Sequence, residues 1–105
     1  MFKIVPDPLF TADVPLTVPG QAETVPVRMT FRYKDKAGLI DFEKRCMDKE
    51  TAVEDLLGEI IEDWNGVDAP CTPDAIKQIC AHYVTAPAEI ISAFNKELVR
   101  SKIKN

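Results

Sequence analysis

Histidine and the residue patterns of common catalytic sites are scarce in this chain. His82 is the only histidine among the 105 residues, and the sequence has no nucleophile elbow, phosphate-binding loop or dinucleotide-binding glycine pattern. Cys80 and His82 stand two residues apart, a spacing that turns their side chains to different sides of a helix. We therefore expect neither a catalytic site nor a cofactor, and predict that the protein is not an enzyme.

Metal ligands are equally sparse. The three cysteines, Cys46, Cys71 and Cys80, cannot all pair within one chain, and an odd number is typical of free thiols in a reducing cytoplasm. A zinc site built from Cys71, Cys80 and His82 would lack the paired Cys-x-x-Cys arrangement of structural zinc sites. We expect no metal, and the pattern assigns no role to the cysteines.

Long apolar runs and excess positive charge are also missing. No run reaches the roughly 18 apolar residues of a membrane-spanning helix, and the first residues do not follow the pattern of a secretion signal. The sequence thus predicts a cytoplasmic protein without a membrane segment. A formal net charge of −4 argues against a nucleic-acid partner, because such proteins usually carry a basic surface.

Apolar residues alternate with polar ones in two stretches on either side of a turn at residues 19–23. This alternation is typical of half-buried strands, so the stretches predict a β-hairpin. Pro15 and Pro26 lack an N–H group, which indicates that both strands are edge strands. The inward faces are predicted to carry Phe10, Ala12, Val14, Leu16 and Val18 on one strand and Val25, Val27, Met29, Phe31 and Tyr33 on the other.

Four helices are predicted after the hairpin. Asp35, Asp48 and Thr72 are expected to cap the first three, and Thr85 begins the fourth. The second helix has the strongest periodicity and ends at the turn formed by Asn65 and Gly66. Its predicted apolar stripe ends in the only tryptophan, and consists of Val53, Leu56, Leu57, Ile60, Ile61 and Trp64.

Together these elements predict an α+β fold in one domain, residues 1–105. The β-hairpin is expected at about 9–34, packed on a bundle of about four short α-helices at about 36–103. Asp63 and Asp68 flank Trp64, and we interpret them as turn and solvent-facing residues rather than an acid/base pair.

Three segments of the sequence resemble the small tail assembly chaperones of long-tailed bacteriophages and prophages. They are the opening Phe2–Pro8 with Phe10–Ala12, the second strand Val25–Lys34, and Asp63–Asp68 with Pro70. The resemblance extends over nearly the full length, and its most specific part is the Trp-x-Gly-Val-Asp turn followed by a capped helix.

The resemblance implies a non-enzymatic cytoplasmic factor that coats the long helical tape measure protein, helps tail-tube subunits to polymerise around it, and is absent from the mature virion. It also favours a homo-oligomer. A groove for the tape measure protein is expected beside Trp64 and the last helix, with Ile90, Ile91, Phe94 and Leu98, although the same residues could be internal core. The alternative is a structural tail component, such as a tail completion or tube-associated protein.

Overall fold

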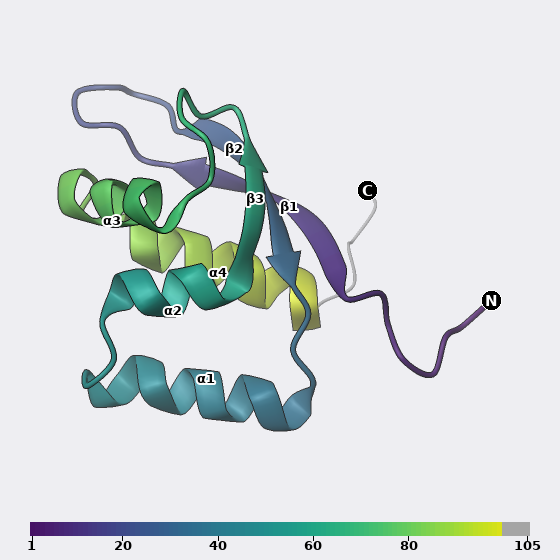
Figure 1. Ribbon diagram of the computed structural model, residues 1–105. Helices are drawn as coiled ribbons and strands as arrows, with labels where there is room; N and C mark the ends of the chain where they lie inside the picture. The colour runs from purple at the N-terminus through teal and green to yellow at the C-terminus, as the bar shows by residue number, and fades with distance from the viewer. Residues whose placement is uncertain (100–105) are drawn as a thin grey trace.

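The computed structural model describes residues 1–99; the predicted end of the helical part, residues 100–103, lies outside this range. The α+β class and the N-terminal hairpin are confirmed. In chain order the elements are β1 (Leu9–Leu16), β2 (Val25–Arg32), α1 (Lys36–Asp48), α2 (Val53–Ile60), β3 (Ile61–Asn65), α3 (Pro73–His82) and α4 (Ala86–Val99), as labelled in Figure 1.

The sheet has three antiparallel strands in the order β1-β2-β3. The prediction that both hairpin strands are edge strands is therefore wrong for β2, which is central. Pro15 and Pro26 lie directly opposite each other, and β3 pairs only with the part of β2 from Arg28 onward. Pro26 thus lies past the end of that ladder, where its missing N–H costs no strand hydrogen bond.

The predicted second helix is too long, because α2 ends at Ile60 and the chain continues directly as β3. Ile61 and Trp64 are three residues apart, a spacing that would place them on opposite faces of a regular strand. The β2–β3 register is irregular here: Phe31 pairs with Ile61 and Met29 with Trp64, so three steps along β3 match two along β2. This bulge lets both Ile61 and Trp64 point into the core.

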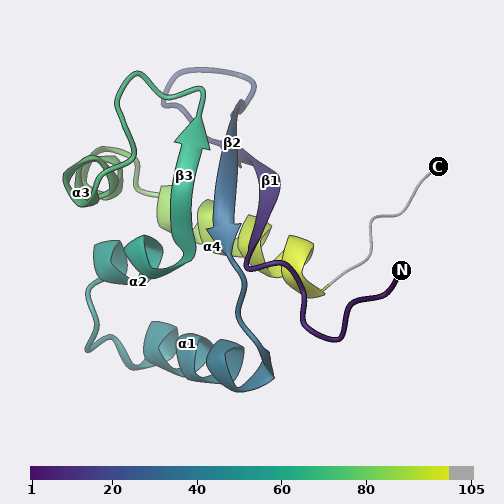
Figure 2. The ribbon, with the colours of Figure 1, turned by 45° about the vertical axis from the view of Figure 1, so that its right-hand side comes forward.

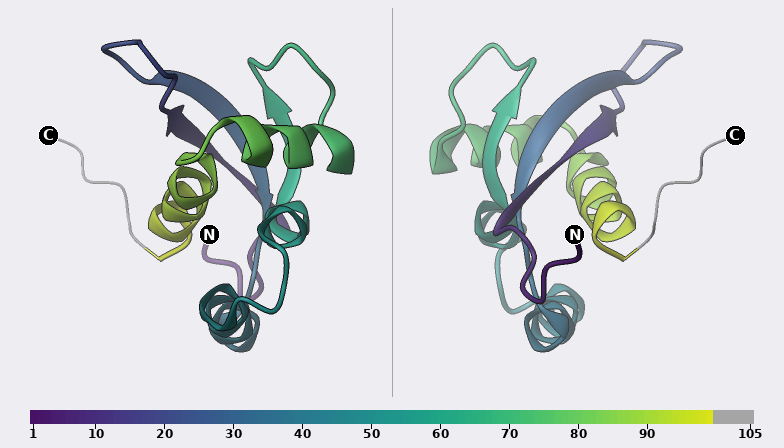
Figure 3. Two further views of the ribbon diagram at one scale, coloured as in Figure 1. Left: turned by 90° about the vertical axis from the view of Figure 1, so that its left-hand side faces the viewer. Right: turned by 90° about the vertical axis from the view of Figure 1, so that its right-hand side faces the viewer.

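One face of the sheet is covered by helices, as Figure 3 shows from two sides. Figure 2 shows α4 behind the three strands. Within residues 1–99, no helix covers the opposite face of the sheet, which is turned toward the viewer. Phe94 of α4 lies at the centre of the core, with its ring 5.4–5.9 Å from the rings of Phe10, Phe31 and Phe42. The core therefore joins both hairpin strands, α1 and α4.

Two of the three predicted helix caps are present. The carboxylate of Asp35 accepts a hydrogen bond from the N–H of Gly38, and the hydroxyl of Thr72 accepts one from Ala75. Asp48 does not cap α2, because it is the last residue of α1 and its carboxylate accepts from the N–H of Glu50. The N-cap of α2 is Ala52, which has no side-chain cap.

Candidate partner-binding surface

Trp64 anchors the loop that follows β3. Its side chain is buried, and its indole N–H donates to the carbonyl of Ala69 over 2.8 Å. Gly66 adopts a φ of +92°, which L-residues rarely tolerate, so the Asn65–Gly66 turn forms as predicted but ends a strand instead of a helix. The indole therefore fixes residues 65–69 against the body of the protein.

An apolar hollow of about 360 Å³ opens beside this loop. It lies between the turn end of the hairpin, the loop after β3 and one side of α3, and a smaller hollow of about 200 Å³ next to Trp64 shares part of its lining. We call this surface the α3 groove and define it by Val18, Val25, Val67, Ile79 and Tyr83.

The structure separates the predicted partner-binding residues. Ile90 and Phe94 have 1% and 0% of their surface exposed and belong to the core, whereas Ile91 and Leu98 are only partly buried. The hollow beside Trp64 is lined by the loop after β3 and by α3, with no residue of α4 among residues 86–99. Partner binding by these five residues stays a prediction.

Sequence reasoning missed the α3 groove. Val18 and Val25 were expected on the inward face of the hairpin, but they flank its turn and are only partly covered; Val25 is 37% exposed. The sequence signal was limited to their position next to the hairpin turn, which indicates less cover than in the middle of each strand but does not indicate that α3 lies beside them. Val84, the residue after Tyr83, is 91% exposed and extends the apolar character of this end of the molecule.

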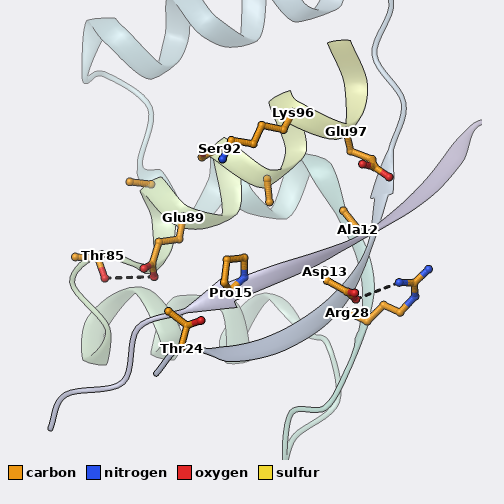
Figure 4. A pocket seen from close by; sticks show the side chains of 12 residues that line it. Ala12, Asp13, Pro15, Thr24, Arg28, Thr85, Glu89, Ser92, Lys96 and Glu97 are labelled. Carbon is orange, nitrogen blue, oxygen red and sulfur yellow. Dashed lines mark hydrogen bonds and ion pairs between the residues drawn. The ribbon is translucent and has the colours of Figure 1, made fainter. Parts of the chain in front are cut away.

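A second, more polar groove of about 680 Å³ lies between β1 and α4 (Figure 4). At one end Glu89 of α4 accepts hydrogen bonds from the N–H and the hydroxyl of Thr17, and from the hydroxyl of Thr85. Burial opposes ionisation of Glu89, but these bonds outweigh it and lower the pKa of its carboxyl group. Glu89 thereby joins the end of β1 to the start of α4.

An ion cluster joins α1 to α2. Arg45 donates two hydrogen bonds of 2.7 Å to the carboxylate of Glu59, which also pairs with Lys34. The hydrogen bonds from Arg45, with a smaller contribution from Lys34, lower the pKa of Glu59 to about 2 despite partial burial. Glu59 therefore belongs to an ion cluster between two helices, which the sequence patterns did not predict.

The three cysteines are free thiols, and each is partly buried. Burial raises the pKa of Cys46, Cys71 and Cys80, so these thiols are protonated and weakly nucleophilic at neutral pH. Within residues 1–99, no group of three or more His, Cys, Asp or Glu side chains is arranged to hold a metal ion. Asp63 and Asp68 are both exposed.

Comparison with known proteins identifies the family. A family model described as "Phage tail assembly chaperone" matches residues 1–105. The chain belongs to the phage tail assembly chaperone family. No curated protein and no solved structure matches it.

Membership in the tail assembly chaperone family confirms the resemblance seen in the sequence and implies a non-enzymatic role, with interactions among phage tail proteins. In the part of the chain that the structure describes, no helix is long and apolar enough to cross a membrane. For a chaperone, the surfaces that matter are those able to cover a partner, and the α3 groove is the most apolar concave surface described above.

Proposed function

We propose that this tail assembly chaperone binds the tape measure protein, keeps it soluble and assists assembly of the tail tube around it. The observation that supports this proposal best is the open apolar α3 groove in a member of this family. A long chain with exposed apolar helical stripes aggregates unless a partner covers those stripes. An amphipathic helix laid in a groove is a common way to provide such cover.

The α3 groove suits this role because of its shape and its support. Two of its walls, the hairpin end and α3, are regular elements, and the loop between them is fixed by the hydrogen bond from Trp64 to Ala69. Trp64 thus supports the groove indirectly, by holding this loop in place, and direct contact of Trp64 with a partner stays a prediction. Ile91 and Leu98 on α4 form a second candidate surface, to be tested beside the first.

Co-expression with the tape measure protein tests the proposal. We expect the chaperone to increase the soluble fraction of the tape measure protein several-fold and to co-purify with it. Val25→Asp should abolish most of this increase, because it places a charge in the α3 groove. Ile40→Asp is the matched control, since Ile40 is 57% exposed on α1, away from the groove.

Ile91→Asp separates the two surfaces. If Val25→Asp is folded by circular dichroism and still rescues the tape measure protein while Ile91→Asp does not, α4 provides the binding surface instead. If the tape measure protein is equally soluble alone and no complex forms, the proposed function is wrong.

We further propose that the protein acts in the bacterial cytoplasm and leaves before the virion is complete. A tail completion or tube-associated protein would instead remain in the particle. Mass spectrometry of purified virions should therefore lack peptides of this chain, while the lysate contains them. Stoichiometric amounts in the virion would favour the structural alternative.

A further inference from the structure

The α3 groove has apolar walls and an acidic rim. Each of the three segments that enclose it carries one carboxylate: Glu23 in the hairpin turn, Asp68 in the loop after β3 and Asp74 in the first turn of α3. Asp68 lines both the groove and the smaller hollow, and Asp74 accepts a 2.6 Å hydrogen bond from Gln78, which lines the smaller hollow. No Lys or Arg within residues 1–99 lines either hollow. A partner that enters the groove therefore meets negative charge along its edges.

Two of the rim carboxylates lack the basic partners that carboxylates elsewhere in the protein have. Glu59, for example, pairs with two basic residues of its own domain. Within residues 1–99, neither Glu23 nor Asp68 forms an ion pair or a side-chain hydrogen bond. Lys77, the one lysine of α3, is two residues from Ile79, so helical spacing turns it away from the groove. The charge on the rim is thus available to a partner.

Asp68 has a fixed position in the rim. Val67 and Ala69 on either side of it are partly buried, whereas Asp68 itself is exposed. The carbonyl of Ala69 accepts the hydrogen bond from the indole of Trp64, which ties this part of the loop to the core. Because a group on a fixed backbone loses less conformational freedom on binding, Asp68 is suited to select a partner by charge.

The net charge of residues 1–99 acts in the same direction. This part of the chain contains all 17 acidic residues but only ten of the 13 basic ones, since Arg100, Lys102 and Lys104 come later, and its formal net charge is −7. A field of one sign raises the association rate of partners of the opposite sign. A basic partner is therefore favoured before any specific contact forms.

Lysine and arginine suit both features of the groove. Their aliphatic chains can lie along apolar side chains such as Val67 and Tyr83 while the charged group reaches Asp68. In a helix, residues three and four apart lie on one side, so basic residues at this spacing can follow an apolar stripe along its flank. The chemistry that fits the groove is therefore an apolar helical stripe flanked by basic residues.

We propose that the α3 groove selects amphipathic helices whose apolar stripe is flanked by Lys or Arg, and that Asp68 is the residue that sets this preference. The identity of the partner rests on the proposed function, which makes these helices segments of the tape measure protein. The selectivity itself rests on the apolar walls and on the unpaired carboxylates of the rim.

Two designed helical peptides test the selectivity on the full chain. Both have about 18 residues and the same leucine stripe, and they differ only in carrying Lys or Glu on its flanks. Fluorescence anisotropy of the labelled peptides measures their affinities. We expect the Lys peptide to bind about tenfold more tightly than the Glu peptide at about 20 mM salt, and the ratio to fall toward one at about 500 mM salt.

Substitutions assign the preference to a residue. Asp68→Asn should reduce the ratio of the two affinities about threefold, and Asp68→Lys should abolish it. Glu43→Gln is the matched control: it removes the same charge from an exposed position on α1, which α2 separates from α3 in Figures 1 and 3. Val25→Ser should weaken both peptides alike, because it reduces the apolar contact and leaves the charge unchanged. Circular dichroism checks that each variant is folded.

The outcomes separate this selectivity from the proposed function. Equal binding of the two peptides at low salt overturns the selectivity, as does a preference that Asp68→Lys leaves unchanged. If neither peptide binds while the chain still solubilises the tape measure protein, the selectivity is wrong and the proposed function stands. If the Lys peptide is preferred but the tape measure protein is not solubilised, the selectivity stands and the proposed function is wrong.

Discussion

Glu59 shows how one residue can carry a pH-dependent share of stability. Its carboxylate joins Arg45 of α1 to α2, and its pKa in the folded protein is about 2. A carboxyl group with a lowered pKa stabilises the fold above its unfolded pKa of about 4.3, and this contribution is lost as pH falls toward 2. The shift would correspond to about 3 kcal/mol, which solvent screening of the partly exposed cluster reduces.

We therefore expect Glu59→Gln to lower the free energy of unfolding by about 1–2 kcal/mol at pH 7 and by little at pH 2. Urea unfolding at a series of pH values measures this difference. Glu62→Gln is the control, because its ion pair with Arg32 is more exposed, with both side chains 44% accessible, and should be worth under about 1 kcal/mol. Equal effects of the two substitutions at pH 7 would contradict this account.

At the level of elements, two glycines in adjacent segments have opposite requirements. Gly66 needs its positive φ of +92°, whereas Gly58 lies inside α2 with open space where a Cβ would be. Gly66→Ala should destabilise the protein by about 1–2 kcal/mol through backbone strain, and Gly58→Ala should stabilise it by about 0.5–1 kcal/mol. Thermal unfolding of both variants tests the pair, and a stabilising Gly66→Ala would refute the assigned turn.

The transition from α2 to β3 shows where sequence reasoning stops. The hairpin and the Asp35 and Thr72 caps follow from local patterns, and the structure confirms them. Ile61 and Trp64 also fit a helical stripe, so only the open edge of β2, a long-range feature, distinguishes strand from helix. The α3 groove could not be predicted for the same reason: the turn end of the hairpin and α3 are brought together only by the fold.

At the level of the whole molecule, the α4 helix holds the core together through Phe94. Its ring contacts those of Phe10, Phe31 and Phe42, which come from β1, β2 and α1. A domain of this size has a total stability of about 5–15 kcal/mol. Loss of a residue that contacts three other elements should thus weaken the whole fold, not one surface of it.

We expect Phe94→Ala to lower the free energy of unfolding by about 3–5 kcal/mol, and Phe10→Ala by less, because Phe10 is only partly buried. Urea unfolding measures both. Phe94→Ala should fail to bind the tape measure protein only under conditions in which the variant itself unfolds. Val25→Asp should fail to bind the tape measure protein while the variant is still folded. If Phe94→Ala remains nearly as stable as the natural chain and still fails to bind, then Phe94 contacts the partner directly, and α4 must move away from the sheet when the complex forms.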